Sequence, residues 1–468
     1  MDQNPSTYKQ PTPPQSPQPE GVSQFGAGES TPFYKKIPLK AFGVVLLLVL
    51  LIGGGVIGAM RLVGGRQQNE PVTLAWWGLW EDGGIVQPLI EEYQKTHPNV
   101  KITYVRQSPQ DYRERLTSSL ARNAGPDIFR FHNTWVPLFA NDLTTLLPEV
   151  LSASEFQSRF YPIAASDLTH NGRIVGIPLE IDGLGLYVND ALFKAANLTS
   201  PTTWDELRRA ALALTTRDQQ GSITQAGVAL GTVNNVDHWQ DILSLMMLQN
   251  SANPARPTDK RAEDALAFYT IFATADKVWD ETLPPSTLSF ASGKVAMYFA
   301  PSWEVFEVKA KNPSLSFHIV PVPQLPKSTP GEEDITWASY WAEGVWARSK
   351  HPKEAFEFLK FMSEKESLEK LYRTAAQTRL FGEPYPRPDM AELLANDSLA
   401  GAYVREASTA HSWYLAGRTF DGPTGINSRI SKYFEDAVNK VLKGSTPTEA
   451  LKTVEQGVSQ VLSSYGAR

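Results

Sequence analysis

The sequence predicts an α/β protein with a parallel sheet and room for two hydrophobic cores, preceded by one transmembrane helix. Three observations lead to this prediction. The chain has 468 residues, which is long for one ordinary domain and sufficient for two sizeable cores. Strand-like and helix-like periods alternate from residue 72 onward. An uncharged, apolar run fills the whole interval between Lys40 and Arg61.

The amino-terminal part divides into a tail, an anchor and a tether. Residues 1–34 are predicted to be a disordered Pro/Gln-rich tail, because this composition buries too little apolar surface to offset the entropy of ordering. Residues 35–62 are predicted to be a membrane anchor helix. Their central segment, residues 41–60, would span about 30 Å as a helix, which matches the bilayer core. Residues 63–72 would then form a short tether.

The anchor is predicted to stay uncleaved, with the amino terminus in the cytoplasm. Its apolar run is longer than a typical signal-peptide core and starts only after residue 40. The three lysines at positions 35, 36 and 40 outnumber Arg61 and Arg66 on the other side. We therefore predict a single-pass protein of the cytoplasmic membrane with an extracytoplasmic body.

Composition excludes several classes of function. The chain has no cysteine, which rules out a disulfide framework, a thiolate zinc site, a cysteine nucleophile and a lipoprotein anchor. Residues 1–70 carry six basic and four acidic side chains, so the remainder has a net charge of −8. This acidic body argues against nucleic-acid binding. No catalytic, metal or phosphate-loop motif occurs, so we predict neither an enzyme nor a cofactor.

The body opens with a strand–helix–strand–helix–strand pattern. Strands are expected at residues 72–77, 100–105 and 127–131, and helices are expected between them. This order predicts a parallel sheet with right-handed crossovers, in which ligands bind beyond the carboxyl ends of the strands. The loops at 76–84 and 131–135 stand at those ends and are rich in aromatic and polar side chains.

Segments spread over residues 73–460 resemble one known family. They are, in order, VTLAWWG, NAGPDIFRF, NGRIVGIPLEIDGLGLYVNDALFKAANL, TTWDEL, FASGKVAMYFAPSW, IVPVPQLP, WAEGVWARSKHPKEAFEFLKFM and TPTEAL. Their order and spacing resemble the family 1 extracellular solute-binding proteins of ABC importers, the group that includes maltose-binding protein. One departure is Val188-Asn189, where the family usually has Tyr-Asn.

The resemblance implies a two-lobe periplasmic-binding-protein fold of type II, with a hinge between the lobes. The first lobe would comprise 73–181 and 320–378, and the second 185–318 and 383–468. Chain crossings are expected near 181–184, 319–321 and 378–382. The implied function is capture of a small solute, above all a mono- or oligosaccharide, by closure of the two lobes of a monomeric body, which delivers the solute to an ABC permease and its ATPase. Two alternatives stay open, namely a ligand-sensing receptor subunit and a binder of a phosphorylated polyol.

The resemblance also implies a set of ligand-binding residues. A pyranose offers a C–H face to aromatic rings and a rim of hydroxyls to carboxylates and amides. Side chains of these types at the family's cleft positions are Trp76, Trp77, Trp80, Asp82, Phe131, Asn133, Trp135, Asp182, Asn234, Trp239, Trp303, Tyr340 and Trp341. Because neighbours on a strand face opposite ways, one of Trp76 and Trp77 must point into the lobe. A glycosidase pair of Glu180 and Asp182 was the enzyme alternative, but nothing places these carboxylates about a scissile bond.

Overall fold

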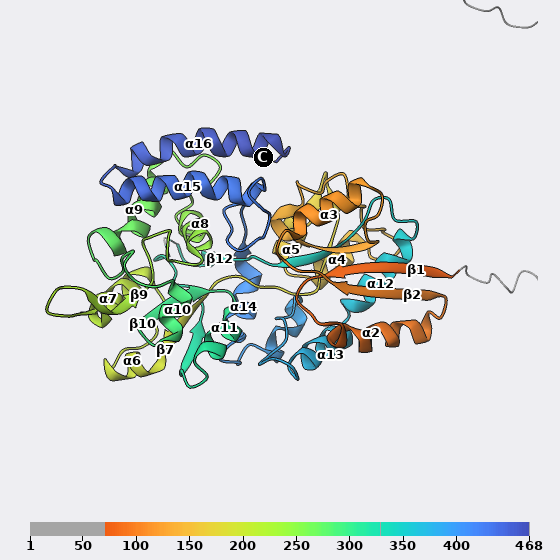
Figure 1. Ribbon diagram of the computed structural model, residues 1–468, viewed down its shortest axis with the longest axis horizontal. Helices are drawn as coiled ribbons and strands as arrows, with labels where there is room; N and C mark the ends of the chain where they lie inside the picture. Colours follow the sequence, from red (N-terminus) through yellow and green to blue (C-terminus); the bar gives the residue numbers. More distant parts are fainter. Residues whose placement is uncertain (1–70, 328, 468) are drawn as a thin grey trace, which may run out of the picture. The chain divides into compact units, whose positions relative to one another are not determined.

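The computed structural model describes residues 71–327 and 329–467, and Glu70–Arg468 forms one compact unit. This unit holds two five-stranded sheets, each with its own helices and its own buried core (Figure 1). The predicted two-lobe α/β fold is confirmed. The predicted tail, anchor helix and most of the tether lie outside the described residues. Among the residues that are described, no helix has the length and apolarity needed to cross a membrane.

The first lobe contains the predicted parallel sheet. Its strand order is β2 (Val100–Arg106), β1 (Val72–Gly78), β3 (Ile128–His132), β13 (Trp341–Val345) and β6 (Ile177–Pro178). β1 runs parallel to β2 and β3, with α2 (Gly83–Thr96) and α3 (Tyr112–Ala121) as the connecting helices. The predicted strand and helix order is therefore confirmed. β13 returns from much later in the chain and pairs antiparallel with β3 and β6.

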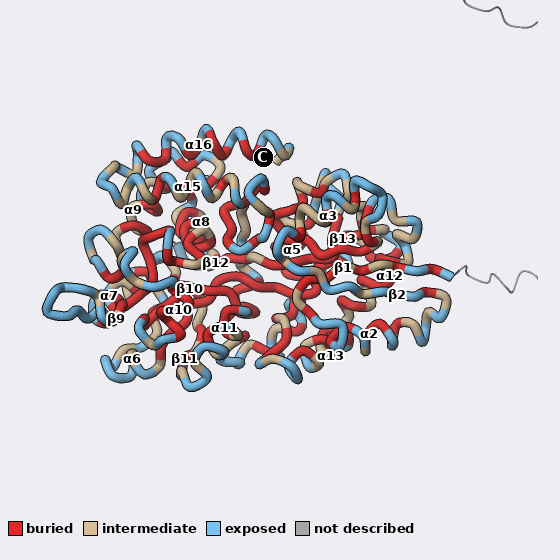
Figure 2. The backbone as a smooth tube through the Cα atoms, in the orientation of Figure 1, coloured by how far each residue is buried: buried red, intermediate tan, exposed pale blue. Residues whose placement is uncertain are grey.

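The rest of the first lobe is helical and short-stranded. It comprises η1 (Asn133–Trp135), α4 (Ala153–Arg159), α5 (Pro162–Asp167), α12 (Pro352–Met362), α13 (Lys365–Ala375) and the small pair β4 (Thr169–His170) and β5 (Arg173–Ile174). Figure 2 shows the buried residues concentrated along the strands, with the outer faces of α2 and α3 exposed.

The second lobe has a mixed sheet. Its order is β11 (Phe317–Val320), β7 (Gly185–Asn189), β10 (Val295–Ala300), β9 (Ile223–Val228) and β8 (Thr216–Arg217). Its helices are α6 (Asp190–Ala195), α7 (Trp204–Leu214), α8 (Trp239–Gln249), α9 (Lys260–Thr274), α10 (Ser286–Ala291) and α11 (Glu304–Lys311), followed late in the chain by α15 (Ile426–Leu442) and α16 (Pro447–Ser464).

Local sequence signals explain how these elements begin. Thr203 caps α7, its hydroxyl accepting from the backbone N–H of Glu206 in a capping box. Trp204 stacks on Phe299 with ring centroids 5.5 Å apart, so it packs inside the lobe. Gly293 has φ +74°, a turn conformation that glycine adopts without strain, and β10 follows directly.

A buried ion network supports the first lobe beneath its ligand loops. Arg130 lies 2.7 Å from Glu81 and 2.7 Å from Glu343, and all three side chains are almost fully buried. The indole N–H of Trp76 also donates to Glu343, at 3.0 Å. Removing one member of such a network leaves an uncompensated buried charge, which costs about 3–5 kcal/mol. The network therefore fixes the loop after β1, which carries Glu81, to the strands β3 and β13.

The chain crosses between the lobes in places that differ partly from the prediction. The first crossing does pass through Asp182–Gly183, where Gly183 forms an antiparallel bridge with Ala338. The second crossing, predicted near 319–321, instead follows β12 (Thr336–Trp337), because residues 317–320 pair with β7 and stay in the second sheet. After α13, Phe381 joins the second core, where its ring centroid lies 4.7 Å from that of Phe306.

Four further short elements complete the seam between the lobes. They are η2 (Pro388–Leu393), α14 (Gly401–Glu406) with η3 (Ala407–Thr409), and β14 (Ala410–His411), which pairs with β12. The segment from Ser412 to α15 follows β14, and three of its residues, Gly417, Arg418 and Phe420, line the cavity between the lobes.

Candidate ligand-binding site

A cavity of about 280 Å³ lies between the two lobes. The first lobe contributes Trp80 from the loop after β1, His132 from the end of β3, and Ser339 and Trp341 at the start of β13. The second lobe contributes residues from the start of α8, the loop after β10, α11 and the segment 417–420. The first crossing contributes Glu180, Asp182, Gly183 and Leu184, and the segment after α13 contributes Arg379 and Glu383. The predicted clustering at the carboxyl ends of β1 and β3 therefore agrees with the cavity's position.

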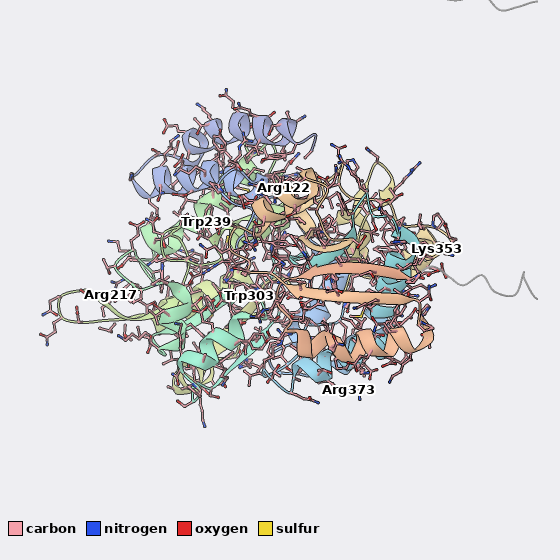
Figure 3. All side chains as sticks on the ribbon, turned by 45° about the vertical axis from the view of Figure 1, so that its right-hand side comes forward. Arg122, Arg217, Trp239, Trp303, Lys353 and Arg373 are labelled. Atoms are coloured by element: carbon pink, nitrogen blue, oxygen red, sulfur yellow. The ribbon has the colours of Figure 1, made fainter. Side chains whose placement is uncertain are left out.

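Aromatic rings form much of the cavity wall. Trp341 lies edge-on to Trp80, with centroids 5.6 Å apart, and to His132, at 5.1 Å. Trp303 projects from the opposite lobe and occupies a central place between the two sets of elements (Figure 3). Trp303 is 36% exposed and Phe420 38% exposed, which is unusual for such large apolar side chains. Exposed rings inside a cavity provide flat apolar surface for a bound solute.

Two carboxylates stand at the floor of the cavity. The Asp182 carboxylate accepts hydrogen bonds from the backbone N–H of Gly183 at 2.8 Å and from the N–H and hydroxyl of Ser302 at 3.0 and 2.8 Å. Burial nevertheless raises the pKa of Asp182 to about 7. Burial, reinforced by the nearby Glu383, holds the pKa of Glu180 well above its usual range. The Asp182 carboxyl group can therefore accept or donate a hydrogen bond near neutral pH.

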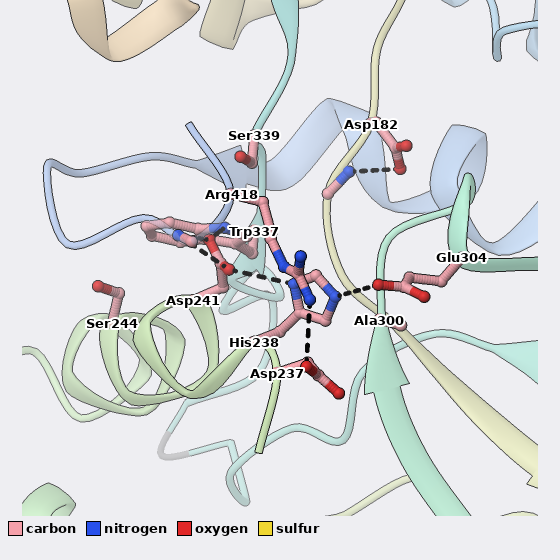
Figure 4. Close-up of polar contacts among 12 residues, drawn as sticks. Asp182, Asp237, His238, Asp241, Ser244, Ala300, Glu304, Trp337, Ser339 and Arg418 are labelled. Atoms are coloured by element: carbon pink, nitrogen blue, oxygen red, sulfur yellow. Dashed lines mark hydrogen bonds and ion pairs between the residues drawn. The ribbon is translucent and has the colours of Figure 1, made fainter. Parts of the chain in front are cut away.

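A polar cluster around His238 forms part of the second-lobe wall of the cavity (Figure 4). The His238 ring lies between Glu304, 3.1 Å from Nε2, and Asp241, 3.7 Å from Nδ1. Burial alone would lower the pKa of His238, but these two carboxylates outweigh burial and raise the pKa to about 9. Asp241 also accepts from the indole N–H of Trp337 at 2.9 Å. His238 meets Trp303 edge-on at 5.6 Å, so the cluster fixes the position of that ring.

The other histidine of the cavity is neutral. His132 Nδ1 lies 2.8 Å from the Thr134 hydroxyl and Nε2 lies 3.1 Å from the Ser339 hydroxyl. Burial lowers the pKa of His132 to about 3. The ring therefore acts as a fixed polar wall without charge.

The cationic side chains that line the cavity already have acidic partners within the described chain. Arg379 pairs with Glu383 at 2.6 Å, and Arg418 pairs with Asp237 at 3.1 Å. Two other arginines of the first lobe do not line the cavity. Arg130 is in the buried network described above, and Arg106 forms an exposed pair with Asp82.

Four of the predicted ligand residues line the cavity together: Trp80, Asp182, Trp303 and Trp341. The others lie elsewhere. Those buried in the lobe cores are Trp76, Phe131, Trp135, Tyr340 and Trp239.

Four polar or partly buried members of the predicted set also lie outside this cavity. Trp77 packs on the other side of β1 from Trp76, and Asp82 is in the exposed pair with Arg106. The Asn234 amide donates to Glu281 at 2.7 Å on the surface. The Asn133 amide donates to Asp167 at 2.8 Å and lines a separate cavity. A hydrogen-bond or ion-pair partner within the protein determines the direction of the Asp82, Asn234 and Asn133 side chains.

Several residues that line the cavity were not among the predicted ligand-binding residues. These are Arg379, Glu383, Phe306, Gly417, Arg418 and Phe420, with Glu180 considered only as a catalytic acid. They come from segments far apart in the chain, and no local period marks them. The Gly-rich stretch GRTFDGPTG at 417–425, which also contains an Asp and a Pro, was the one available signal, because such compositions favour irregular loops that carry function.

Two α/β lobes with an aromatic, carboxylate-bearing cavity between them define a two-lobe binding protein. The family model for bacterial extracellular solute-binding proteins matches residues 77–369. The multiple sugar-binding protein of Streptococcus mutans is 22% identical over 367 residues, covering 73% of this chain and 81% of that protein. An uncharacterised ABC transporter extracellular-binding protein of Pyrococcus horikoshii is 22% identical over 354 residues, covering 68% and 76%.

Solved structures share the fold. A cyclo/maltodextrin-binding protein has a TM-score of 0.68 at 17% identity, covering 85% of this chain and 99% of its own. The sugar-binding protein MalE of Xanthomonas citri has a TM-score of 0.68 at 19% identity, covering 84% and 98%. The chain belongs to the family 1 bacterial extracellular solute-binding proteins, which serve ABC importers, as its motifs predicted. This is a family of solute-binding proteins with an extracytoplasmic body, not of enzymes.

The raised pKa of His238 predicts a specific pH dependence of stability. An unfolded histidine loses its proton near pH 6.5, whereas folded His238 keeps it up to about pH 9. Its stabilising contribution should be complete below about pH 6.5 and should vanish as the pH rises to about 9. The difference in unfolding free energy between wild type and H238Q should therefore shrink across this window, by up to about 1.4 kcal/mol per pH unit.

Urea unfolding of both proteins across this pH range measures the difference. E304Q, which removes one of the two carboxylates that raise the pKa, should move the upper end of the window to lower pH. A wild-type-minus-H238Q difference that stays constant from acid to alkaline pH would contradict the assigned charge state.

Proposed function

We propose that the chain captures a small neutral sugar, a mono- or oligosaccharide, by closing its two lobes around the sugar, and delivers it to an ABC permease with its ATPase. The observation that carries the proposal is the combination of Trp303, Trp341 and Trp80 with the Asp182 and Glu180 carboxylates around one cavity. The rings suit the C–H face of a pyranose, and the carboxylates suit its hydroxyls. A site built this way rejects analogues without those hydroxyls, because its own polar groups would lose their partners.

The electrostatics of the cavity favour a neutral ligand over a phosphorylated one. A phosphate group requires cationic donors that are free to bind it. Among the described residues that line the cavity, Arg379 and Arg418 are engaged by Glu383 and Asp237. Glu180 and Asp182 add acidic groups at the floor, which would repel an anion when ionised.

Relatives support the sugar class. The similar structures include a maltodextrin-binding protein complexed with maltotetraose, a solute-binding protein from Thermotoga lettingae bound with α-D-tagatose, and a protein with mannobiose bound. Each has the same fold at 23% identity or less, so these ligands suggest a chemical class and do not specify one sugar.

The proposal includes attachment to the outer face of the cytoplasmic membrane through residues 41–60, with a monomeric binding body. The support is the sequence of that segment, which has no charged residue between Lys40 and Arg61. A short tether would keep the lobes near the permease and raise the local concentration of captured ligand there.

Alkaline carbonate extraction of expressing cells tests the attachment. The full chain should remain in the membrane pellet, because a spanning helix withstands loss of peripheral contacts. A chain lacking residues 1–68 should appear in the soluble fraction. Extraction of the full chain into the supernatant would contradict the proposed anchor.

Ligand binding is tested by thermal unfolding against neutral sugars, sugar phosphates, polyols and amino acids. A ligand that binds only the folded chain adds about 2.7 kcal/mol of stability at one hundred times its Kd. We expect a selective shift with neutral sugars, and we expect W303A and D182A each to weaken the affinity at least about tenfold.

The matched control is W77A, which removes a tryptophan outside the cavity and should keep the sugar affinity of the wild type. A shift with phosphorylated or charged solutes alone would overturn the sugar assignment. Equal losses of affinity in W77A and W303A would show that the cavity is not the binding site.

A further inference from the structure

The loop from Gly417 to Gly422 presents two side chains to the cavity and holds the rest inside the protein. Gly417, Thr419 and Asp421 are buried, whereas Arg418 and Phe420 between them are exposed and line the cavity. The loop is anchored to the second lobe from both ends. The Gly417 N–H donates to the Asp241 carboxylate at 3.1 Å, and the Asp421 carboxylate accepts from the N–H of Asn427 at the start of α15.

The backbone of this loop is strained at the positions that face the cavity. Arg418 has φ +56° and Phe420 has φ +54°, a left-handed conformation that non-glycine residues rarely adopt. Such strain persists where surrounding contacts enforce it, and it is concentrated at ligand clamps and other functional positions. Here it aims both side chains at the cavity, while Thr419 and Asp421 stay in the protein.

The loop reaches across to the first lobe. The Phe420 ring lies 5.9 Å from the Trp80 ring, which belongs to the loop after β1. A little further along, the Arg113 side chain of α3 donates to the Thr424 hydroxyl at 2.7 Å. A side chain at Gly422 would collide with the carboxylate of Glu114, so the loop backbone itself abuts the first lobe. Phe420 and Trp80 therefore meet over one side of the cavity.

We propose that this loop limits the length of the ligand: Phe420 against Trp80 closes one side of the cavity, so that the site takes short sugars and rejects longer chains. The inference rests on the proposed sugar-binding function and assigns the size class of its ligand. At about 280 Å³, the cavity is at the small end of ligand pockets, which run from roughly 300 to 1,000 Å³. A pocket of this size suits a ligand smaller than a drug-sized one, and a longer sugar chain would have to displace Phe420.

The test compares chain lengths in the wild type and in F420G. Glycine adopts the left-handed conformation of position 420 without strain, so F420G removes the ring and leaves the loop backbone able to fold. F420L, which keeps an apolar side chain at the mouth, is the matched variant. Calorimetric titration with glucose to maltotetraose and with mannose to mannotetraose gives a Kd for each length in each protein.

In the series that binds, the wild type should bind the tetrasaccharide at least about tenfold more weakly than the mono- or disaccharide. F420G should bring this ratio below about threefold, and F420L should stay close to the wild type. A wild type that binds all lengths equally, or an F420G with an unchanged ratio, overturns the length limit and leaves sugar binding standing. If no sugar of either series binds the wild type or F420G, the proposed function fails, and the length limit fails with it.

Discussion

The close approach of two chain segments at Gly183 is the constraint on which the two-lobe arrangement depends. Gly183 bridges to Ala338, and any side chain at position 183 would overlap the carbonyl oxygen of Trp337. The adjacent Asp182 accepts from Ser339 through its backbone carbonyl and from Ser302 through its carboxylate. The residue therefore joins both crossing strands and the second lobe while it faces the cavity. In the proposed closure of the lobes, rotation would concentrate in these few residues, and a cavity-lining carboxylate would lie at the pivot.

The cationic groups around the cavity are paired with carboxylates, which suits the hydroxyl-rich, uncharged ligand that we propose. Examples are Arg379 with Glu383 and His238 between Asp241 and Glu304. The floor carboxylate of Asp182 is held by neutral donors, and burial keeps its pKa near 7. Water-excluded polar groups of this kind gain most when a ligand supplies complementary hydrogen bonds, and exposed rings such as Trp303 gain most when an apolar face covers them.

The sequence was informative where structure follows from local period and less so where it depends on packing. The first three strands and two helices followed from alternation and helical spacing. Trp135 and Tyr340 were both predicted to contact the ligand, yet both rings are buried in the core of the first lobe. Which face such a ring presents depends on contacts from distant segments. Phe420 faces the cavity only because a strained loop, anchored by Asp241 and α15, holds it there, and no pattern near position 420 encodes that anchor.

In the function that we propose, the solute is enclosed by movement of one lobe against the other. The distance between the two lobes, measured with and without the solute, tests this closure most directly. The chain has no cysteine, so S118C on α3 and S459C on α16 introduce two spin labels at exposed positions of opposite lobes. Pulsed electron–electron double resonance then gives the distribution of distances between the two labels in the full-length chain. If the lobes close on the ligand, a sugar that raises the unfolding temperature should shift the distribution of label distances and reduce it to a single population. An identical distribution with and without that bound sugar would contradict capture by lobe closure.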